Sequence, residues 1–406
     1  MSKPPRVGSS RRTFVASGLA AALLAGHSLP LTAQGPSRAH TTIAQAARQP
    51  AAPSLLALLP QPAGYLPAPE FPVQLVNIAA ALAPHGLEPM AAGDDPADAA
   101  AHVDALATSP WARHEMWAAP DAWRETFGFN PFAVHALADY GPMDDYLLLV
   151  RADIDEQEVQ RAWGTLGYVP IGDTPGVMRL DMDDAARLDF MLAGPIGLFS
   201  GSYDYVAALP DGVLGFSSSQ ERVERIVALA DGDRGSILDH RAVAACATLL
   251  PPETTLAWHL NGARFWADPA DAPLLLPPAG TNVTQEQHDK ITANVATDEE
   301  LLREIEDEHG PMPALELVTL AATPTQHLLM ICPLDPESTD TALEIVSRRF
   351  EGMNSRSTTK PYTDLFRVAG TTVSESGVGV MTLDALGGAT LFRLLEAGDV
   401  RFLNWA

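Results

Sequence analysis

Cysteine, lysine and long apolar runs are scarce in this chain, and each shortage excludes a class of protein. Two cysteines in 406 residues exclude a disulfide-rich scaffold and a zinc site built from paired CxxC motifs. Only three residues are lysine, and 26 basic residues face 51 acidic ones, which gives a net charge of −25. Because nucleic-acid binding needs clustered Lys and Arg, we expect no nucleic-acid partner. No apolar run reaches the roughly 20 residues of a membrane span, so we expect no integral membrane segment in the mature chain.

The remaining composition is that of a globular protein. Hydrophobic residues make up 47% of the chain and charged residues 19%, a balance that supplies a core and is not typical of disorder. At roughly 100–200 residues per domain, the length accommodates two or three domains.

The N-terminus carries the clearest motif. The segment Ser10-Arg11-Arg12-Thr13-Phe14-Val15 precedes a short apolar stretch, Gly18–Ala25, and the small residues Leu31-Thr32-Ala33 offer a cleavage site. Residues 1–33 resemble a bacterial twin-arginine (Tat) export signal. The alternative is a basic tail before a weak helix. The resemblance implies a soluble protein that is exported by the Tat route to the periplasm, the cell surface or the medium.

Composition and patterning divide the chain into four parts. Residues 1–33 are the predicted signal peptide, and residues 34–54 read as a flexible leader rich in Ala and Pro. Residues 55–250 and 251–406 are predicted to form a first and a second lobe. For residues 55–406 we recognise no family.

The two predicted lobes share an order of elements, which indicates an internal duplication. In each lobe a hairpin is followed by a helix, a second hairpin and a second helix. The strands of the first hairpins are 133–138 with 146–150, and 315–321 with 327–331. We therefore expect an α+β fold with two similar lobes, each an antiparallel sheet with helices on one face, in a split β-α-β-like layout. The alternative is a chance likeness between generic strand–helix patterns.

Aromatic residues crowd one segment of the first lobe. Trp111, Trp117, Trp123 and Phe127 lie within 17 residues of one another. They are either a hydrophobic plug over the open face of the lobe or the lining of an apolar groove for a ligand or partner.

Two histidines are candidates for chemistry between the lobes. His259 and His327 each fall on a predicted strand of the second lobe, and ligand sites favour domain interfaces. Core histidines are the alternative interpretation of both.

No known catalytic motif is complete in this sequence. His114-Glu115 begins like a zinc-protease helix, but Ala118 stands where the second His must be. Nucleophile-elbow, phosphate-loop and dinucleotide motifs are absent as well. We therefore predict a non-catalytic binding or assembly protein that binds an unknown small ligand or protein partner. The alternative is an extracytoplasmic, hydrolase-like enzyme with a site in the interlobe cleft.

The two cysteines and three acidic turns each allow more than one role. Cys246 and Cys332 are buried free thiols, a disulfide that ties the lobes together, or metal-binding or catalytic groups. No cofactor is predicted. The acidic turns starting at Asp94, Asp181 and Asp231 are typical of helix caps, with calcium binding as the alternative.

Overall fold

The structure of the protein is a computed structural model. All of the residues that it describes belong to one of the two units into which the chain divides, namely 49–267 with 302–406. The expected signal peptide, residues 34–50 of the leader and Trp111 lie outside the described residues. The described residues are 51–60, 73–107, 115–140, 146–171, 176–181, 203–233, 235–262, 306–308, 310–355, 357–387, 390–397 and 399–403.

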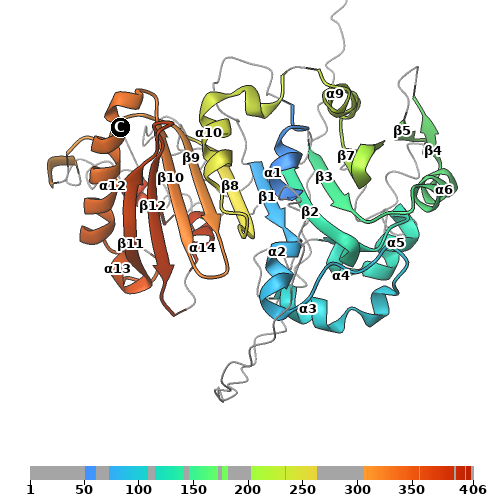
Figure 1. Ribbon diagram of the computed structural model, residues 1–406, viewed down its shortest axis with the longest axis horizontal. Coiled ribbons are helices and arrows are strands. Elements are labelled where there is room, and N and C mark those ends of the chain that lie inside the picture. Colours follow the sequence, from blue (N-terminus) through green and yellow to red (C-terminus); the bar gives the residue numbers. More distant parts are fainter. Residues whose placement is uncertain are drawn as a thin grey trace, which may run out of the picture. The chain divides into compact units, whose positions relative to one another are not determined.

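The strands of the described residues form one 12-stranded sheet (Figure 1). Its order is β11-β12-β10-β9-β8-β1-β2-β3-β7-β6-β5-β4. Every neighbouring pair is antiparallel. The predicted α+β class with an antiparallel sheet is confirmed. The strands are β1 (Val73–Asn77), β2 (Val134–Tyr140), β3 (Leu147–Ala152), β4 (Tyr168–Pro170), β5 (Val177–Leu180), β6 (Tyr205–Leu209), β7 (Val213–Ser217), β8 (Leu256–Asn261), β9 (Leu315–Ala322), β10 (His327–Pro333), β11 (Phe366–Val373) and β12 (Gly379–Ala385).

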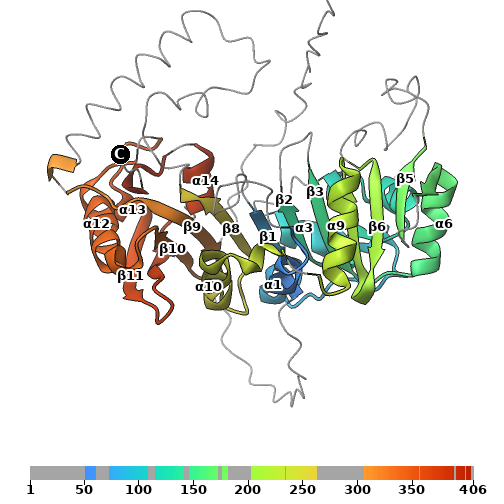
Figure 2. The ribbon, with the colours of Figure 1, turned by 90° about the horizontal axis from the view of Figure 1, so that it is seen from above.

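Helices cover both faces of this sheet, and each face has its own core. The larger core contains Trp123, Leu256 and Phe350, whereas the smaller core contains Leu149 and Cys246. Over the larger core lie α2 (Ile78–Leu82), α3 (Ala100–Ala107), α4 (Glu115–Ala118), α5 (Pro120–Phe127), α6 (Glu156–Leu166), α12 (Thr339–Gly352), α13 (Tyr362–Leu365) and α14 (Leu391–Glu396). Over the smaller core lie α1 (Ala51–Leu56), α9 (Gln220–Ala230) and α10 (Arg241–Leu249). Figure 2 shows α1 and α10 on one side of the strands and α14 on the other.

The expectation of helices on one face only was wrong. All seven residues of β10 are buried, and five of the six residues of β3 are buried. A strand that is apolar on both faces needs a packing layer on each side, as in sheets that are covered twice. None of the described helices combines the length and the apolarity that a membrane crossing requires.

Short sequence signals fix the elements locally. Asp155 begins α6, and its carboxylate accepts hydrogen bonds from the amides of Gln157 and Glu158 at 2.9 and 3.2 Å. Asp211 and Gly212 join β6 to β7 with φ angles of +61° and +69°. Two residues with positive φ make the tight turn that hairpins favour.

The strands on the two sides of the β1–β8 pair follow the same order. On one side the sheet runs β1-β2-β3-β7-β6, and on the other β8-β9-β10-β12-β11. In both halves the helix after the third strand, α6 or α12, packs on the larger core. The helices that follow β7 and β12 differ, because α9 packs on the smaller core and α14 on the larger. The first half continues past β6 with β5 and β4. The second half has no described strand beyond β11, which therefore forms an edge of the sheet.

Candidate functional site

The three described members of the aromatic cluster are buried. Trp123 and Phe127 are each 1% exposed, and Trp117 is 9% exposed and donates from its indole Nε1 to the Pro131 carbonyl at 3.1 Å. The Trp123 ring centroid lies 4.5 Å from that of Phe127 and 5.9 Å from that of Tyr203. These side chains therefore fill the larger core, in the position of the hydrophobic plug.

His259 and His327 belong to opposite faces of the sheet. The His259 imidazole lies on the face of the smaller core, where its Nδ1 is 2.8 Å from Thr319 Oγ1. The His327 ring lies on the other face, with its centroid 5.7 Å from that of Phe366 and 6.3 Å from that of Phe392. The sheet separates the two rings, so they do not form a joint catalytic pair.

A row of buried polar side chains runs beneath α10. His259 Nε2 has no hydrogen-bond partner among the described residues, whereas Nδ1 forms a hydrogen bond with the Thr319 hydroxyl. The Thr319 hydroxyl in turn bonds the Cys246 thiol. Cys246 Sγ lies 3.5 Å from Cys332 Sγ. Three strands and one helix thus contribute to a continuous row from His259 to Cys332.

The pKa values of this row follow from burial and from its hydrogen bonds. Full burial lowers the pKa of His259 to about 4, because an imidazolium would lose its hydration. The hydrogen bond between the thiols lowers the pKa of Cys246 and raises that of Cys332, which burial raises further. Either sulfur can be the donor of this hydrogen bond, and Cys246 is the thiol that ionises more readily.

A histidine–glutamate pair lies at the start of α10. His240 Nε2 is 3.2 Å from Glu316 Oε1, and the two side chains are only 9% and 18% exposed. Burial lowers the pKa of His240, and the nearby Glu316 carboxylate partly opposes that shift. The pair links His240, the N-cap residue of α10, to Glu316 of β9.

A second polar network organises the loop before α13. The buried Asp399 carboxylate accepts hydrogen bonds from the hydroxyls of Ser355, Ser357 and Tyr362 at 2.6–2.7 Å. Burial and the contact with Asp399 raise the pKa of Tyr362. The Asp399 carboxylate therefore fixes a surface loop from within, and sequence reasoning did not identify it.

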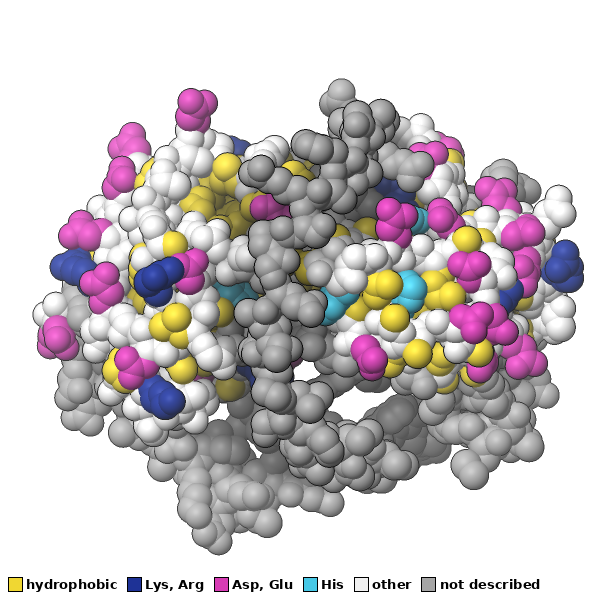
Figure 3. Space-filling model, turned by 60° about the horizontal axis from the view of Figure 1, so that its bottom comes forward, with side chains coloured by type: hydrophobic (Ala, Val, Ile, Leu, Met, Phe, Trp, Pro, Cys, Tyr) yellow, Lys and Arg dark blue, Asp and Glu magenta, His cyan; other side chains and the backbone are white. Residues whose placement is uncertain are grey.

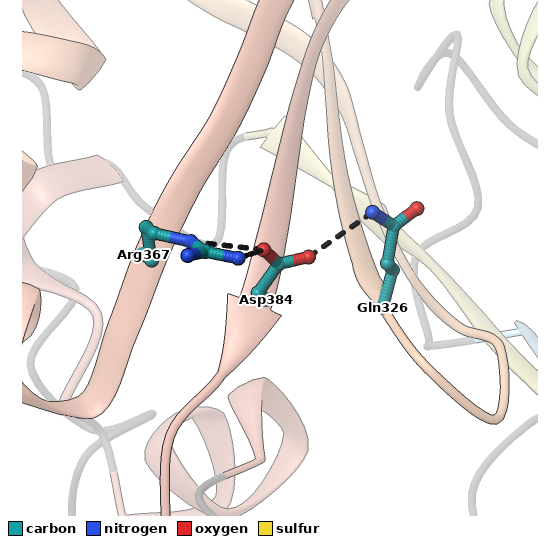
Figure 4. A network of polar contacts seen from close by, with 3 residues as sticks. All are labelled: Gln326, Arg367 and Asp384. Atoms are coloured by element: carbon teal, nitrogen blue, oxygen red, sulfur yellow. Dashed lines mark hydrogen bonds and ion pairs between the residues drawn. The ribbon is translucent and has the colours of Figure 1, made fainter.

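Three side chains, one each from β11, from β12 and from the turn before β10, form a polar network near the edge of the sheet (Figure 4). Asp384 of β12 accepts hydrogen bonds from Arg367 Nε at 3.0 Å and from Gln326 Nε2 at 3.1 Å. Arg367 of β11 is the direct cross-strand partner of Asp384. These contacts, that with Arg367 first, lower the pKa of the Asp384 carboxyl. The one charged side chain of β11 is thereby neutralised.

Arg367→Ala is expected to raise the pKa of Asp384, because the main group that stabilises its charged form is lost. The lowered pKa stabilises the fold above the ordinary carboxyl pKa, and this contribution disappears as pH falls through the folded value. A carbon-detected NMR titration of labelled Asp side chains measures the shift. Arg348→Ala, which removes a helical partner of Glu344 instead, is the matched control. An unchanged Asp384 titration in the Arg367 variant would contradict this assignment.

The described residues of the acidic turns named for calcium make local contacts, and residues 182–184 of the second turn lie outside the described residues. Asp95 accepts a hydrogen bond from the amide of Ala97 at 3.0 Å, and Asp233 lies 3.3 Å from Arg225. Asp181 lies 3.5 Å from Arg179. Among the described ranges, no group of three or more His, Cys, Asp or Glu side chains could hold a metal ion. Acidic side chains are spread over the face shown in Figure 3.

Comparison with known proteins adds no relative. No protein-family model matches the chain, and neither a curated protein nor a solved structure shows significant similarity to it.

Proposed function

We propose that this chain is an exported, non-catalytic binding or assembly protein of the periplasm or cell surface. The twin-arginine motif within residues 1–33 supports export. The burial of His259 and Cys246 supports a non-catalytic role, since both are among the groups that could perform acid–base or nucleophilic chemistry. The proposal includes no cofactor and no calcium.

The proposal includes an internal duplication of the chain. The shared order β1-β2-β3-β7-β6 and β8-β9-β10-β12-β11 supports it, as does the equivalent placement of α6 and α12. The opposite placement of α9 and α14 is then a divergence between the copies.

The single observation that carries the binding function is the open edge of the sheet at β11. In the first half the equivalent strand, β6, is paired along its outer side by β5. No described strand pairs with the outer side of β11, although it is eight residues long. At the other edge, β4 has only three residues and ends in Pro170, which blocks strand addition.

The chemistry of β11 suits a second copy of this chain. Residues 368–373 carry no charge, and Arg367 is neutralised by Asp384, so two acidic chains can approach there without local repulsion. Ala369, Thr371 and Thr372 are exposed. Antiparallel pairing of β11 with its own copy would occupy the position that β5 holds beside β6, under two-fold symmetry.

Thr372→Lys is expected to weaken self-association about tenfold or more, because a charge on an edge strand opposes strand addition. Sedimentation equilibrium of the full chain over a range of concentrations measures it. Thr165→Lys, on the exposed surface of α6, adds the same charge elsewhere and is expected to leave the association unchanged. A wild-type chain that stays monomeric at all concentrations overturns assembly through β11.

The enzyme alternative requires groups that converge at one solvent-reachable place. His259 and His327, its named candidates, face opposite sides of the sheet. Turnover of a hydrolase or transferase panel by the mature protein would nevertheless overturn the non-catalytic proposal.

A further inference from the structure

The two cysteines of the chain meet in the core although 86 positions separate them in sequence. Cys246 lies in the middle of α10 and Cys332 near the end of β10. Their sulfur atoms are 3.5 Å apart, and the side chains are 0% and 5% exposed. A hydrogen bond between two thiols is weak, so this contact alone does little to hold the helix on the sheet.

We infer that Cys246 and Cys332 form a disulfide that fastens α10 to the sheet. A disulfide has a sulfur–sulfur distance of about 2.05 Å, so the sulfur atoms would approach each other by about 1.5 Å. The link would join the last helix of residues 55–250 to the third strand of the second half. It rests on the proposed export for its oxidising surroundings.

The reaction is a thiol–disulfide exchange with an organic disulfide as the oxidant. The thiolate of Cys246 attacks one sulfur of the oxidant, and the other sulfur leaves as a thiolate. The thiolate of Cys332 then attacks the Cys246 sulfur of this mixed disulfide and releases the second thiolate. The cysteines lose two protons and two electrons, and the oxidant becomes two thiols. The order agrees with the pKa directions of the pair, in which Cys246 ionises first.

Burial determines when this exchange takes place. Neither sulfur is reachable for an external disulfide once α10 has closed over the sheet. The bond therefore forms during folding or during a local opening of α10. After it has formed, the same burial protects it from external reductants.

The test uses the full chain, refolded with oxidised and reduced glutathione and then denatured without reductant. We expect a mass 2 Da below that of the reduced chain, from the loss of two hydrogens, and no modification by iodoacetamide. We also expect the oxidised protein to unfold at a temperature on the order of 5 °C higher than the reduced protein. The double variant Cys246→Ser/Cys332→Ser is the control, and dithiothreitol should not shift its unfolding temperature.

Two results separate the disulfide from the export on which it rests. Free, alkylated thiols after refolding in oxidised glutathione overturn the disulfide itself. A disulfide that forms with glutathione but is absent from protein isolated from its host supports the pair and overturns the export.

Discussion

Trp123→Ala is expected to lower the free energy of unfolding by about 3–5 kcal/mol, among the largest effects of any single substitution in this chain. Trp123 is 1% exposed and packs against the rings of Phe127, Phe129 and Tyr203. Removing the indole leaves a cavity that these rigid neighbours cannot fill completely. The lost burial of the indole and the cavity both lower the free energy of unfolding. Urea unfolding, followed by circular dichroism at pH 7, measures the change.

The same experiment decides between the two interpretations of the aromatic cluster. Leu334→Ala truncates a side chain that is 55% exposed, and it is expected to change the stability by less than about 0.5 kcal/mol. A core plug predicts a large loss of stability for Trp123→Ala beside this control. An empty ligand groove predicts a small loss of stability for Trp123→Ala. That result would support the interpretation of the aromatic cluster as a binding surface.

Local patterning was sufficient to predict the hairpins of this fold. Strands were expected at 133–138 with 146–150 and at 315–321 with 327–331, and β2, β3, β9 and β10 form at these positions. Asp155 likewise begins α6 through a local contact, the hydrogen bonds that its carboxylate accepts from the amides of Gln157 and Glu158. Each of these signals acts within a few residues, where the sequence determines the geometry directly.

Contacts between distant segments were beyond this reasoning. The sequence places His259 and His327 on strands, but the faces of those strands depend on registers set by β9. A shift of one residue would turn either imidazole to the other face. The meeting of Cys246 with Cys332 depends in the same way on where α10 packs. Thr319 carried a weak signal, because it is the one hydroxyl in an otherwise apolar stretch of β9.

The edge strand β11 and the buried row beneath α10 differ in how they hold charge. The side chains of the buried row under α10 are uncharged, as a core without water requires. Full burial lowers the pKa of His259 to about 4, so its ring is neutral at pH 7. The edge strand instead pairs Arg367 with Asp384 at the surface, where water screens both charges. The first arrangement suits a buried core, whereas the second lies at the edge of the sheet, where β12 is the one described strand that pairs with β11.

Acidification from pH 6.5 to pH 4 is expected to cost the protein about 3 kcal/mol of stability through His259 alone. The ordinary His pKa is 6.5, and burial lowers the folded value to about 4. Between these values the unfolded chain binds a proton that the folded chain does not, so stability falls as pH falls. Below pH 4 both states are protonated and this contribution no longer changes. Urea unfolding at intervals of half a pH unit measures the slope.

His259→Asn isolates this contribution, because the amide can still form a hydrogen bond with Thr319 but does not titrate. The variant is expected to be less stable than the wild type at pH 7 and to lose less stability on acidification. The difference between the two slopes cancels the contribution of the other histidine near α10, His240. His85→Asn, at an exposed position, is expected to retain the wild-type slope. Equal slopes for wild type and His259→Asn would mean that the His259 ring is reached by water, and would reopen it as a candidate for chemistry.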